Sequence, residues 1–282
     1  MTDNQSILIT GCSSGIGLYT ATHLQQHGFQ VFATARKADD VERLKQLGLN
    51  SLQLDLTDSL SIKNTVIRVL AETDGKLYAL FNNGAYGLPG AVEDLSRDAL
   101  RDQFETNLFG SHELTSLVLP TMRKQGYGRI IQNSSILGFA AMPYRGAYNS
   151  SKFALEGLSD TLRQELYGSN IHVSLIEPGP ILSEFRNNAL KAFEKYIDME
   201  NSPHQAQYQS MLKRLHTQGA AVPFTLGPEA VFEKVLHALQ SKRPRARYYV
   251  TKPTYVMGFL KRLLSTRLMD RVLMLAGGDG RR

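Results

Sequence analysis

Short apolar runs alternate with longer helical patterns along the chain. Seven runs are rich in leucine, aromatic or β-branched residues and are almost continuously apolar, as strands buried on both faces are. They are SILIT (6–10), QVFATA (30–35), SLQLDL (51–56), LYALFNN (77–83), GRIIQNSS (128–135), IHVSLIEP (171–178) and RYYVT (247–251). Helical stretches of about ten or more residues separate them, as parallel βαβ units require. The pattern predicts an α/β fold with one doubly wound parallel sheet of about seven strands and helices on both faces.

Residues 183–226 depart from this alternation. The segment follows the sixth predicted strand and is rich in Gln, Asn, His and Met, and Pro203 and the run VPF (222–224) interrupt its helical pattern. We interpret it as a mobile helical lid with few buried contacts, lying over a binding site.

The tail, residues 253–282, is apolar and basic. Apolar residues at 260, 263, 264, 268, 272 and 275 form a helical stripe, and Ser265–Thr266 can divide it into two helices by capping the second. Docking on the protein body or a partner subunit is favoured, and contact with an anionic membrane surface is the alternative. Residues 1–282 are thus predicted to form one domain with a lid and a tail.

Composition narrows the function classes. Apolar residues make up 42% and charged residues 21% of the 282, an ordinary globular balance. The net charge of +6 is compatible with an anionic ligand, but no nucleic-acid-binding module is recognisable, so no nucleic-acid partner is expected. The single cysteine, Cys12, fits a reducing compartment, and neither a secretory signal nor a spanning apolar run is evident. We expect a cytoplasmic location.

A glycine-rich turn follows the first predicted strand, in LITGCSSGIGLYTATHL (8–24). Glycines allow backbone to approach an anion closely, and the following helix start offers free N–H groups, so a pyrophosphate is the expected guest. A plain structural turn is the alternative. The spacing T-G-x-x-x-G-x-G resembles the short-chain dehydrogenase/reductase family, which implies a Rossmann-type fold and a nicotinamide cofactor. The cofactor-binding residues implied here are Thr10, Gly11, Ser13, Ser14, Gly15, Ile16 and Gly17.

The end of the second strand bears on the choice of cofactor. Many dinucleotide sites carry an acid there, but this chain has Ala35, followed by Arg36. A guanidinium suits a 2′-phosphate, so NADP(H) is preferred, with NAD(H) as a second option and a plain surface arginine as the alternative interpretation. Asp55 and Leu56 match the family's adenine-contacting pair.

Further motifs extend the resemblance over residues 6–185. FNNGAYG resembles the family's N-N-A-G motif with Gly84 and Ala85 in swapped order, and supplies Asn83 and Gly84 on the cofactor side. FETNLFG supplies Asn107 in a helix interior, where asparagine is unfavourable; a capping or solvent-facing asparagine is the alternative. EPGPILS matches P-G-x-x-x-T with serine in place of threonine. It supplies Pro178, Gly179, Ile181 and Ser183.

The segment AMPYRGAYNSSKF (141–153) places Tyr148 and Lys152 four residues apart, on one face of a helix. The resemblance implies that they are catalytic together with Asn107 and with Ser135, thirteen residues before the tyrosine. Tyr148 would exchange a proton with the substrate oxygen, and Ser135 would hold that oxygen. Lys152 and the nicotinamide ring are expected to lower the pKa of the phenol from about 10. Lys152 would also bind the nicotinamide ribose, and Asn107 would orient a relay water. No metal is expected.

The sequence therefore predicts an NADP(H)-dependent oxidoreductase that interconverts a carbonyl and an alcohol. The alternative is a catalytically silent dinucleotide-binding regulator. An apolar substrate is favoured, because the candidate pocket residues are mostly apolar. They are Tyr86, Leu88, Leu137, Phe139, Met142, Arg145, Phe185, Arg186, Leu190, Phe193, Tyr196 and Met199. The alternative is that these side chains pack the lid against the core. The family implies a homodimer or homotetramer through helices at 98–124 and 147–168.

Overall fold

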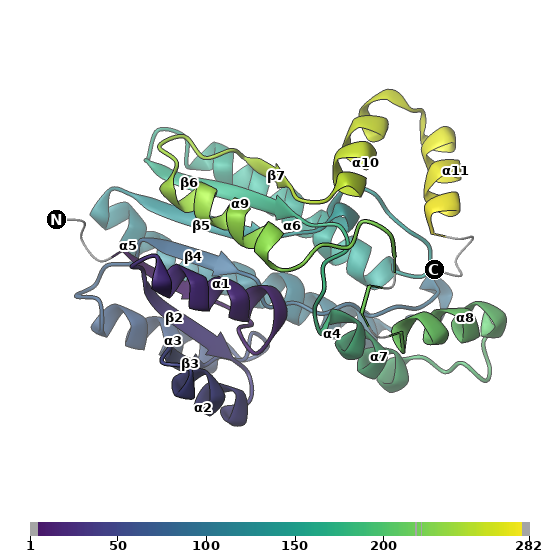
Figure 1. The fold of residues 1–282 in the computed structure, drawn as a ribbon, viewed down its shortest axis with the longest axis horizontal. Coiled ribbons are helices and arrows are strands. Elements are labelled where there is room, and N and C mark those ends of the chain that lie inside the picture. The colour runs from purple at the N-terminus through teal and green to yellow at the C-terminus, as the bar shows by residue number, and fades with distance from the viewer. Residues whose placement is uncertain (1–4, 218, 221, 278–282) are drawn as a thin grey trace.

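The predicted parallel sheet is present in the computed structural model, which describes residues 5–217, 219–220 and 222–277 (Figure 1). Its strands are β1 Ser6–Ile9, β2 Gln30–Ala35, β3 Asn50–Gln53, β4 Ala79–Asn82, β5 Gly128–Asn133, β6 Ile171–Glu177 and β7 Arg247–Tyr249. The strand order is β3-β2-β1-β4-β5-β6-β7, and every neighbouring pair is parallel. The doubly wound Rossmann-type prediction is confirmed, although every strand except β2 is shorter than its predicted run.

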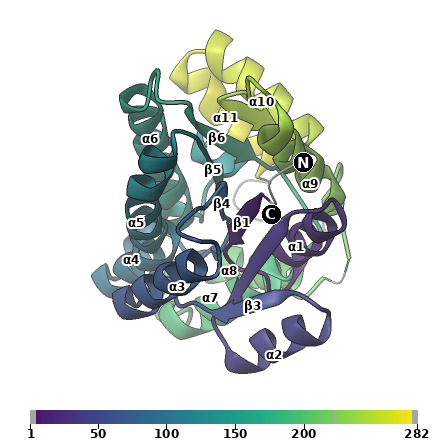
Figure 2. The ribbon, with the colours of Figure 1, turned by 90° about the vertical axis from the view of Figure 1, so that its left-hand side faces the viewer.

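Helices cover both faces of this sheet (Figure 2). One face carries α1 Gly15–Gln26, α2 Ala38–Gln46 and α9 Glu229–Gln240. The other carries α3 Ser59–Ala71, α5 Gly110–Gln125 and α6 Gly146–Glu165. Shorter pieces are η1 Val92–Asp94, α4 Arg97–Phe104, the π-helix η2 Glu105–Phe109 and the 3₁₀-helix η3 Ile136–Gly138.

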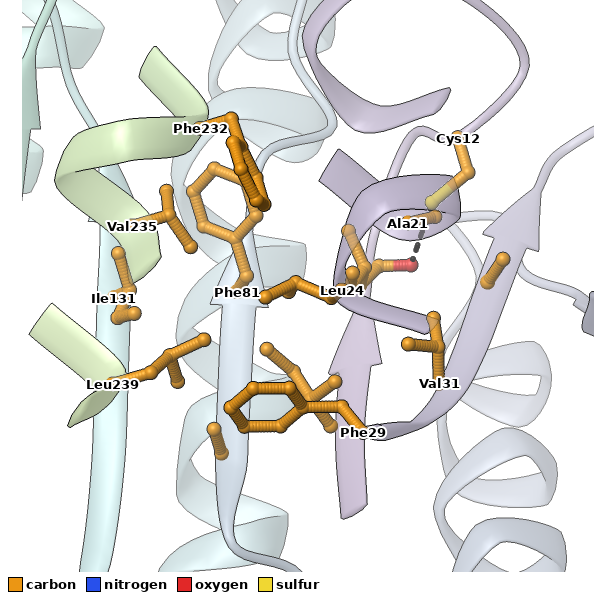
Figure 3. Close-up of a cluster of buried hydrophobic side chains, with 14 of the residues drawn as sticks. Cys12, Ala21, Leu24, Phe29, Val31, Phe81, Ile131, Phe232, Val235 and Leu239 are labelled. Carbon is orange, nitrogen blue, oxygen red and sulfur yellow. Dashed lines mark hydrogen bonds between the residues drawn. The ribbon is translucent and has the colours of Figure 1, made fainter. Parts of the chain in front are cut away.

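Side-chain alternation along the strands divides the core into two layers. Ile7 and Ile9 of β1 belong to the layer beneath α1 and α9, whereas Leu8 belongs to the layer beneath α3 and α5. In the first layer, Leu24 of α1 packs near Phe81 of β4 (Figure 3). Because both faces of each central strand are buried, polar groups that contact ligands are restricted to the strand ends.

The order in which strands are added to the sheet changes sides between β1 and β4. From β1 the strands proceed outward to β3, and the chain then returns to the other side of β1 to build β4–β7. The helices that follow β1 and β4 leave on opposite faces of the sheet, which opens a crevice at the carboxyl ends of these strands. Every motif predicted to bind the cofactor follows a strand at this edge.

The lid contains α7 Phe185–Tyr196 and α8 Gln205–Leu215, beside the carboxyl edge of the sheet (Figure 1). The prediction of few buried contacts is wrong for these helices. Tyr208, Met211 and Leu215 of α8 are buried with Phe193 of α7, in a cluster that also includes Leu88. Their spacing of three to four residues gives α8 an apolar face that the polar composition of the segment concealed.

The tail contains α10 Lys252–Leu263 and α11 Thr266–Ala276, so the predicted division at Ser265–Thr266 is present. Ser265 occupies the cap position but makes no side-chain capping bond, contrary to expectation. The predicted stripe is half correct, because the residues at 263, 268 and 275 are exposed whereas those at 260, 264 and 272 pack against the body. Met257, Met269 and Leu273 are buried, in one cluster with Tyr148. The tail therefore docks on the protein body, over the catalytic helix.

Two negative findings apply to the described ranges. None of their helices has the length and hydropathy needed to cross a bilayer. Their His, Cys, Asp and Glu side chains nowhere gather into a group of three or more suited to a metal ion.

Tyr208 anchors the lid helices. Its side chain is fully buried, its hydroxyl accepts a hydrogen bond from Ala91 N at 2.9 Å, and it donates to Asp94. Tyr208→Ala should lower the free energy of unfolding of the lid by about 3–5 kcal/mol, as large-to-small core changes do. Hydrogen exchange should accelerate in 185–215 with little change in the sheet. Tyr255→Ala, at a half-exposed position, is the control; equal exchange in both variants would contradict this role.

Candidate functional site

The glycine turn between β1 and α1 has the backbone geometry that an anion cradle needs. Gly11 and Gly15 have φ of +70° and +54°, a region that disfavours side chains. A methyl group at Gly17 would lie 2.2 Å from the carbonyl oxygen of Gly11, so a side chain at this position would clash with the turn. Helix α1 begins at Gly15, so its first N–H groups and its positive dipole end face the crevice.

A chain of hydrogen bonds connects this turn to Lys152. The Asn83 Nδ2 donates to the carbonyl oxygen of Thr10 at 2.9 Å and to that of Gly11 at 3.1 Å. Asn133 Nδ2 donates to Asn83 Oδ1 at 2.9 Å. Lys152 Nζ in turn donates to the carbonyl oxygen of Asn133 at 2.7 Å. The ends of β1, β4 and β5 and the helix α6 are thereby fixed relative to one another. Sequence reasoning missed Asn133, because no motif marks it.

The swapped pair Gly84–Ala85 preserves close packing at the turn. The N–H of Gly84 donates to Thr10 Oγ1 at 2.8 Å. A methyl group at Gly11 would lie 2.7 Å from the Cα of Gly84, so the two backbones nearly touch. Leu56 is buried beside Gly84, which explains the small residue there.

At the end of β2, Arg36 is exposed, and its guanidinium makes no hydrogen bond or ion pair with any residue that the structure describes. It is therefore available to a ligand. Asp55 is engaged locally, since its carboxylate accepts hydrogen bonds from Thr57 N at 2.9 Å and Thr57 Oγ1 at 2.8 Å. Arg43, which no motif predicted, donates to the carbonyl oxygen of Ser13 in the glycine turn.

One cavity of about 610 Å³ joins the glycine turn to the catalytic residues. The predicted site residues that line it are Gly11, Ser13, Ser14, Gly15, Ile16, Asn83, Gly84, Ser135, Tyr148, Lys152, Pro178, Gly179, Ile181 and Ser183. The predicted residues outside its lining are Thr10, Gly17, Arg36, Asp55, Leu56 and Asn107. Thr10 and Gly17 shape the turn from behind, and Arg36, Asp55 and Leu56 follow β2 and β3, farther along the sheet edge.

Tyr148 is buried in this cavity, 9% exposed. Burial raises the pKa of its phenol to about 12, and a hydrogen bond with Ser135 acts in the opposite direction. In the protein without ligand, desolvation thus exceeds the favourable contacts, and the predicted lowering by Lys152 together with a bound nicotinamide ring stays a prediction. The neutral phenol is a proton donor throughout the physiological pH range.

Lys152 lies one helical turn after Tyr148, with its Nζ 5.7 Å from the centroid of the phenol ring. Burial lowers the pKa of the ammonium from 10.5 to about 8, and the Glu156 carboxylate opposes this shift. The lysine therefore carries its charge at neutral pH and loses it under mildly alkaline conditions.

Asn107 lies in η2, where a π-turn separates α4 from α5. Its side chain is buried, so the solvent-facing alternative is wrong. The Nδ2 donates to Tyr86 O at 2.8 Å and to Ser151 Oγ at 3.2 Å, and the Oδ1 accepts from Tyr86 N at 3.1 Å. Asn107 thus fixes the loop after β4 against the catalytic helix, and its role in a relay stays a prediction.

The P-G segment closes the cavity opposite the glycine turn. The carbonyl oxygen of Pro178 accepts a hydrogen bond from Ile136 N at 2.8 Å, next to Ser135. A methyl group at Gly15 would lie 2.9 Å from the Cβ of Ser183, so Ser183 borders the glycine turn. The Phe185 ring then packs edge-on against Tyr148, with centroids 5.3 Å apart.

The predicted substrate lining is half correct. Leu88, Leu137, Met142, Arg145, Phe185 and Arg186 line the cavity. Tyr86, Phe139, Leu190, Phe193, Tyr196 and Met199 do not, because they pack in the lid or tail clusters. The sequence missed Arg214, Leu215, Phe224 and Met257. These residues come from the lid and tail, where no fixed spacing identifies a pocket residue.

Comparison with known proteins identifies the family. The model of the short chain dehydrogenase family matches residues 5–193. The chain belongs to the short-chain dehydrogenase/reductase family. It is accordingly an NAD(P)-dependent dehydrogenase or reductase.

Individual relatives support this assignment over most of the chain. An uncharacterized oxidoreductase, YbbO of Escherichia coli K12, is 45% identical over 95% of this chain and 94% of its own. Human 17-beta-hydroxysteroid dehydrogenase type 1 is 34% identical, over 87% of this chain and 77% of its own. A solved actinorhodin polyketide ketoreductase variant with NADPH superposes with a TM-score of 0.71 at 26% identity, covering 89% of this chain and 97% of its own.

The low pKa of Lys152 generates a pH prediction. If its ammonium binds the cofactor ribose, affinity for NADPH is highest below the pKa of about 8 and falls as pH rises through that value. Fluorescence titration of NADPH from about pH 7 to about pH 10 should show this decrease. Tyr148→Phe should retain it, because the phenol titrates far higher, whereas Lys152→Met should bind weakly and without the decrease. A wild-type dissociation constant that is constant over this range would exclude the ribose contact.

Proposed function

We propose that the protein catalyses the NADP(H)-dependent interconversion of a carbonyl compound and its alcohol, with Tyr148 as general acid and base. The observation that carries this proposal is the buried, protonated Tyr148 beside Ser135 and Lys152, in a cavity continuous with the glycine turn. A group that gives a proton to the substrate oxygen must be protonated, within reach and shielded from water, and Tyr148 meets the first and last conditions.

A nicotinamide dinucleotide suits the donor set of this crevice. The N–H groups at the start of α1 and the Gly11–Gly15 backbone fit a pyrophosphate, and Ser183 borders them on the opposite wall. When bound, such a cofactor supplies the hydride. The protein positions the substrate oxygen with Ser135, exchanges the proton at the Tyr148 hydroxyl, and holds positive charge beside the phenol through Lys152.

The preference for NADP(H) is supported by charge at the end of β2. Ala35 brings no carboxylate that would repel a 2′-phosphate, and the exposed Arg36 guanidinium makes no contact with other described residues. Arg43 also lies near the glycine turn, but its guanidinium is paired with the Asp40 carboxylate at 2.9 Å, so Arg36 is the arginine that carries this argument. A guanidinium binds a phosphate through two parallel hydrogen bonds. NAD(H) has no 2′-phosphate and cannot accept them.

An apolar substrate body is supported by the wall next to Tyr148. Leu88, Leu137, Met142, Phe185 and Met257 contribute to it, from loops, lid and tail. One relative is named for a hydroxysteroid, which is a large apolar alcohol. Aldehydes, ketosteroids and retinal are therefore the first compounds to screen.

The alternative is a catalytically silent regulator that binds a dinucleotide. Such a protein has no need for the complete set of Asn107, Ser135, Tyr148 and Lys152, and all four are present and buried. NADPH oxidation with any carbonyl compound at rates abolished by Tyr148→Phe would exclude the regulator.

We also propose that the protein is a homodimer or homotetramer through α4–α5 and α6. Phe109, Phe153 and Leu158 expose large apolar side chains on this region, 48%, 40% and 44% respectively. Association would remove them from water. Sedimentation equilibrium measures the oligomer size.

Tyr148→Phe removes the proton donor while preserving the ring that packs on Phe185. The kcat of carbonyl reduction should fall at least about a hundredfold, the lower end for general acid catalysis, with NADPH affinity retained. Tyr144→Phe is the matched control, because Tyr144 packs in the lid cluster and its hydroxyl bonds to His204 at 3.1 Å. Near-normal turnover by Tyr148→Phe would remove Tyr148 from the mechanism.

Arg36→Ala tests the choice of cofactor. Loss of a charge-assisted contact of roughly 1.5–3 kcal/mol should weaken NADPH binding about ten- to a hundredfold and leave NADH almost unaffected. Arg101→Ala, an exposed arginine paired with Asp98 on α4, is the control. The assignment of Arg36 is wrong if calorimetry shows that the wild type binds NADH and NADPH equally well.

A further inference from the structure

An arginine without a hydrogen-bond partner lines the substrate end of the cavity. Arg214 belongs to the last turn of α8 and contributes to the same cavity as Ser135 and Tyr148. Its Nε is enclosed and makes no hydrogen bond, and the guanidinium forms no ion pair with any described residue. The side chain as a whole is partly exposed, but an enclosed guanidinium nitrogen normally has a hydrogen-bond acceptor, because leaving a buried donor unpaired is costly.

Further positive charge surrounds Arg214. Arg145 and Arg186 line the cavity as well. Arg186 is engaged with the lid backbone, since it donates to Thr217 O at 2.7 Å and to Gly219 O. The acidic side chain in the described lining is Glu184, which accepts a hydrogen bond from Asn187. The described lining thus has three arginines and one carboxylate, and that carboxylate forms no ion pair with an arginine.

The charges act on one another. Burial and the nearby Arg214 lower the pKa of Arg145 to about 9, and burial and Arg186 lower the pKa of Arg214. Arg145 is engaged with the backbone, since it donates to Pro143 O at 3.2 Å. An anion beside Arg214 would take up the free donors of that guanidinium.

We propose that the substrate is an apolar carbonyl compound or alcohol that ends in a carboxylate, which Arg214 binds, with Arg145 providing a second positive charge. This inference rests on the proposed function, because Tyr148 and Ser135 define the reacting end. Leu137, Met142, Leu215 and Met257 provide the apolar wall of the same cavity. One unpaired guanidinium matches one carboxylate in charge.

The cofactor phosphates are the competing anion. In the proposed function, the glycine turn after β1 binds the pyrophosphate and Arg36 after β2 binds the 2′-phosphate. Arg214 instead reaches the cavity from the lid. The two possibilities differ in what Arg214→Met should change. A substrate contact alters discrimination between substrates, and a cofactor contact weakens NADPH binding.

The test compares ω-oxo-alkanoates of increasing chain length with their methyl esters, which have the same aldehyde and no charge. For the best chain length, wild-type kcat/KM should favour the acid by at least about tenfold, the effect of one charge-assisted hydrogen bond. Arg214→Met should bring the ratio of acid to ester near one. Lys213→Met, at the exposed neighbour on α8, should keep the wild-type ratio.

A second measurement does not depend on turnover. Calorimetry should show that a long-chain alkanoate binds the protein–NADP⁺ complex at least about tenfold more tightly than the matching alkanol, and that Arg214→Met removes the difference. Equal affinities, or equal kcat/KM for acid and ester, would overturn the carboxylate site while leaving the oxidoreductase intact. A weakened affinity for NADPH in Arg214→Met with an unchanged acid-to-ester ratio would also overturn it. If none of these aldehydes is reduced, the calorimetric comparison alone decides whether Arg214 binds a carboxylate, and the proposed function fails only if the ketosteroids and retinal are not reduced either.

Discussion

The hydrogen bonds from Thr10 through Asn83 and Asn133 to Lys152 are the constraint on which the site depends. They join the ends of three adjacent parallel strands to the catalytic helix, with successive distances of 2.9, 2.9 and 2.7 Å. Parallel strands bring their carboxyl ends to one edge, but they do not fix the height or rotation of the loops that leave it. Here side-chain amides fix the loops by pairing with backbone groups that would otherwise be buried and unsatisfied. The glycine turn and Lys152 consequently form one rigid unit.

The fold and the nucleotide-binding half of the site could be predicted because they depend on local rules. Continuous apolar runs identify strands buried on both faces, and a turn such as Gly11–Gly17 requires glycine at fixed intervals, so both leave a signature in the sequence. The solvation of each ionisable side chain, in contrast, depends on residues that are distant in the sequence. Burial beneath the tail, more than about a hundred residues away along the chain, raises the pKa of the Tyr148 phenol in the protein without ligand. Spacing identifies Tyr148 and Lys152 but carries no information about their solvation.

The substrate end of the cavity was predicted least well, for the same physical reason. Arg214, Leu215 and Met257 reach it from helices whose apolar and polar residues suit any amphipathic helix. Which face of α8 points inward depends on Tyr208 and its contacts with Ala91 and Asp94, and no short motif encodes that register. The polar composition of the lid suggested few buried contacts, whereas three residues per two turns are enough to bury one face.

The contribution of the tail to the cavity has a consequence for how the protein is made. Met257 and Ala276 line the cavity, and Met269 and Leu273 pack in the cluster that contains Tyr148. The family match ends at residue 193, before either the tail or α8. During synthesis, the glycine turn and the helix with Tyr148 and Lys152 would therefore leave the ribosome before the tail helices that complete the cavity wall. The sheet also lacks β7 until then, and α1 lacks the α9 side chains that pack in its core cluster, so the site is completed only when nearly the whole chain is present.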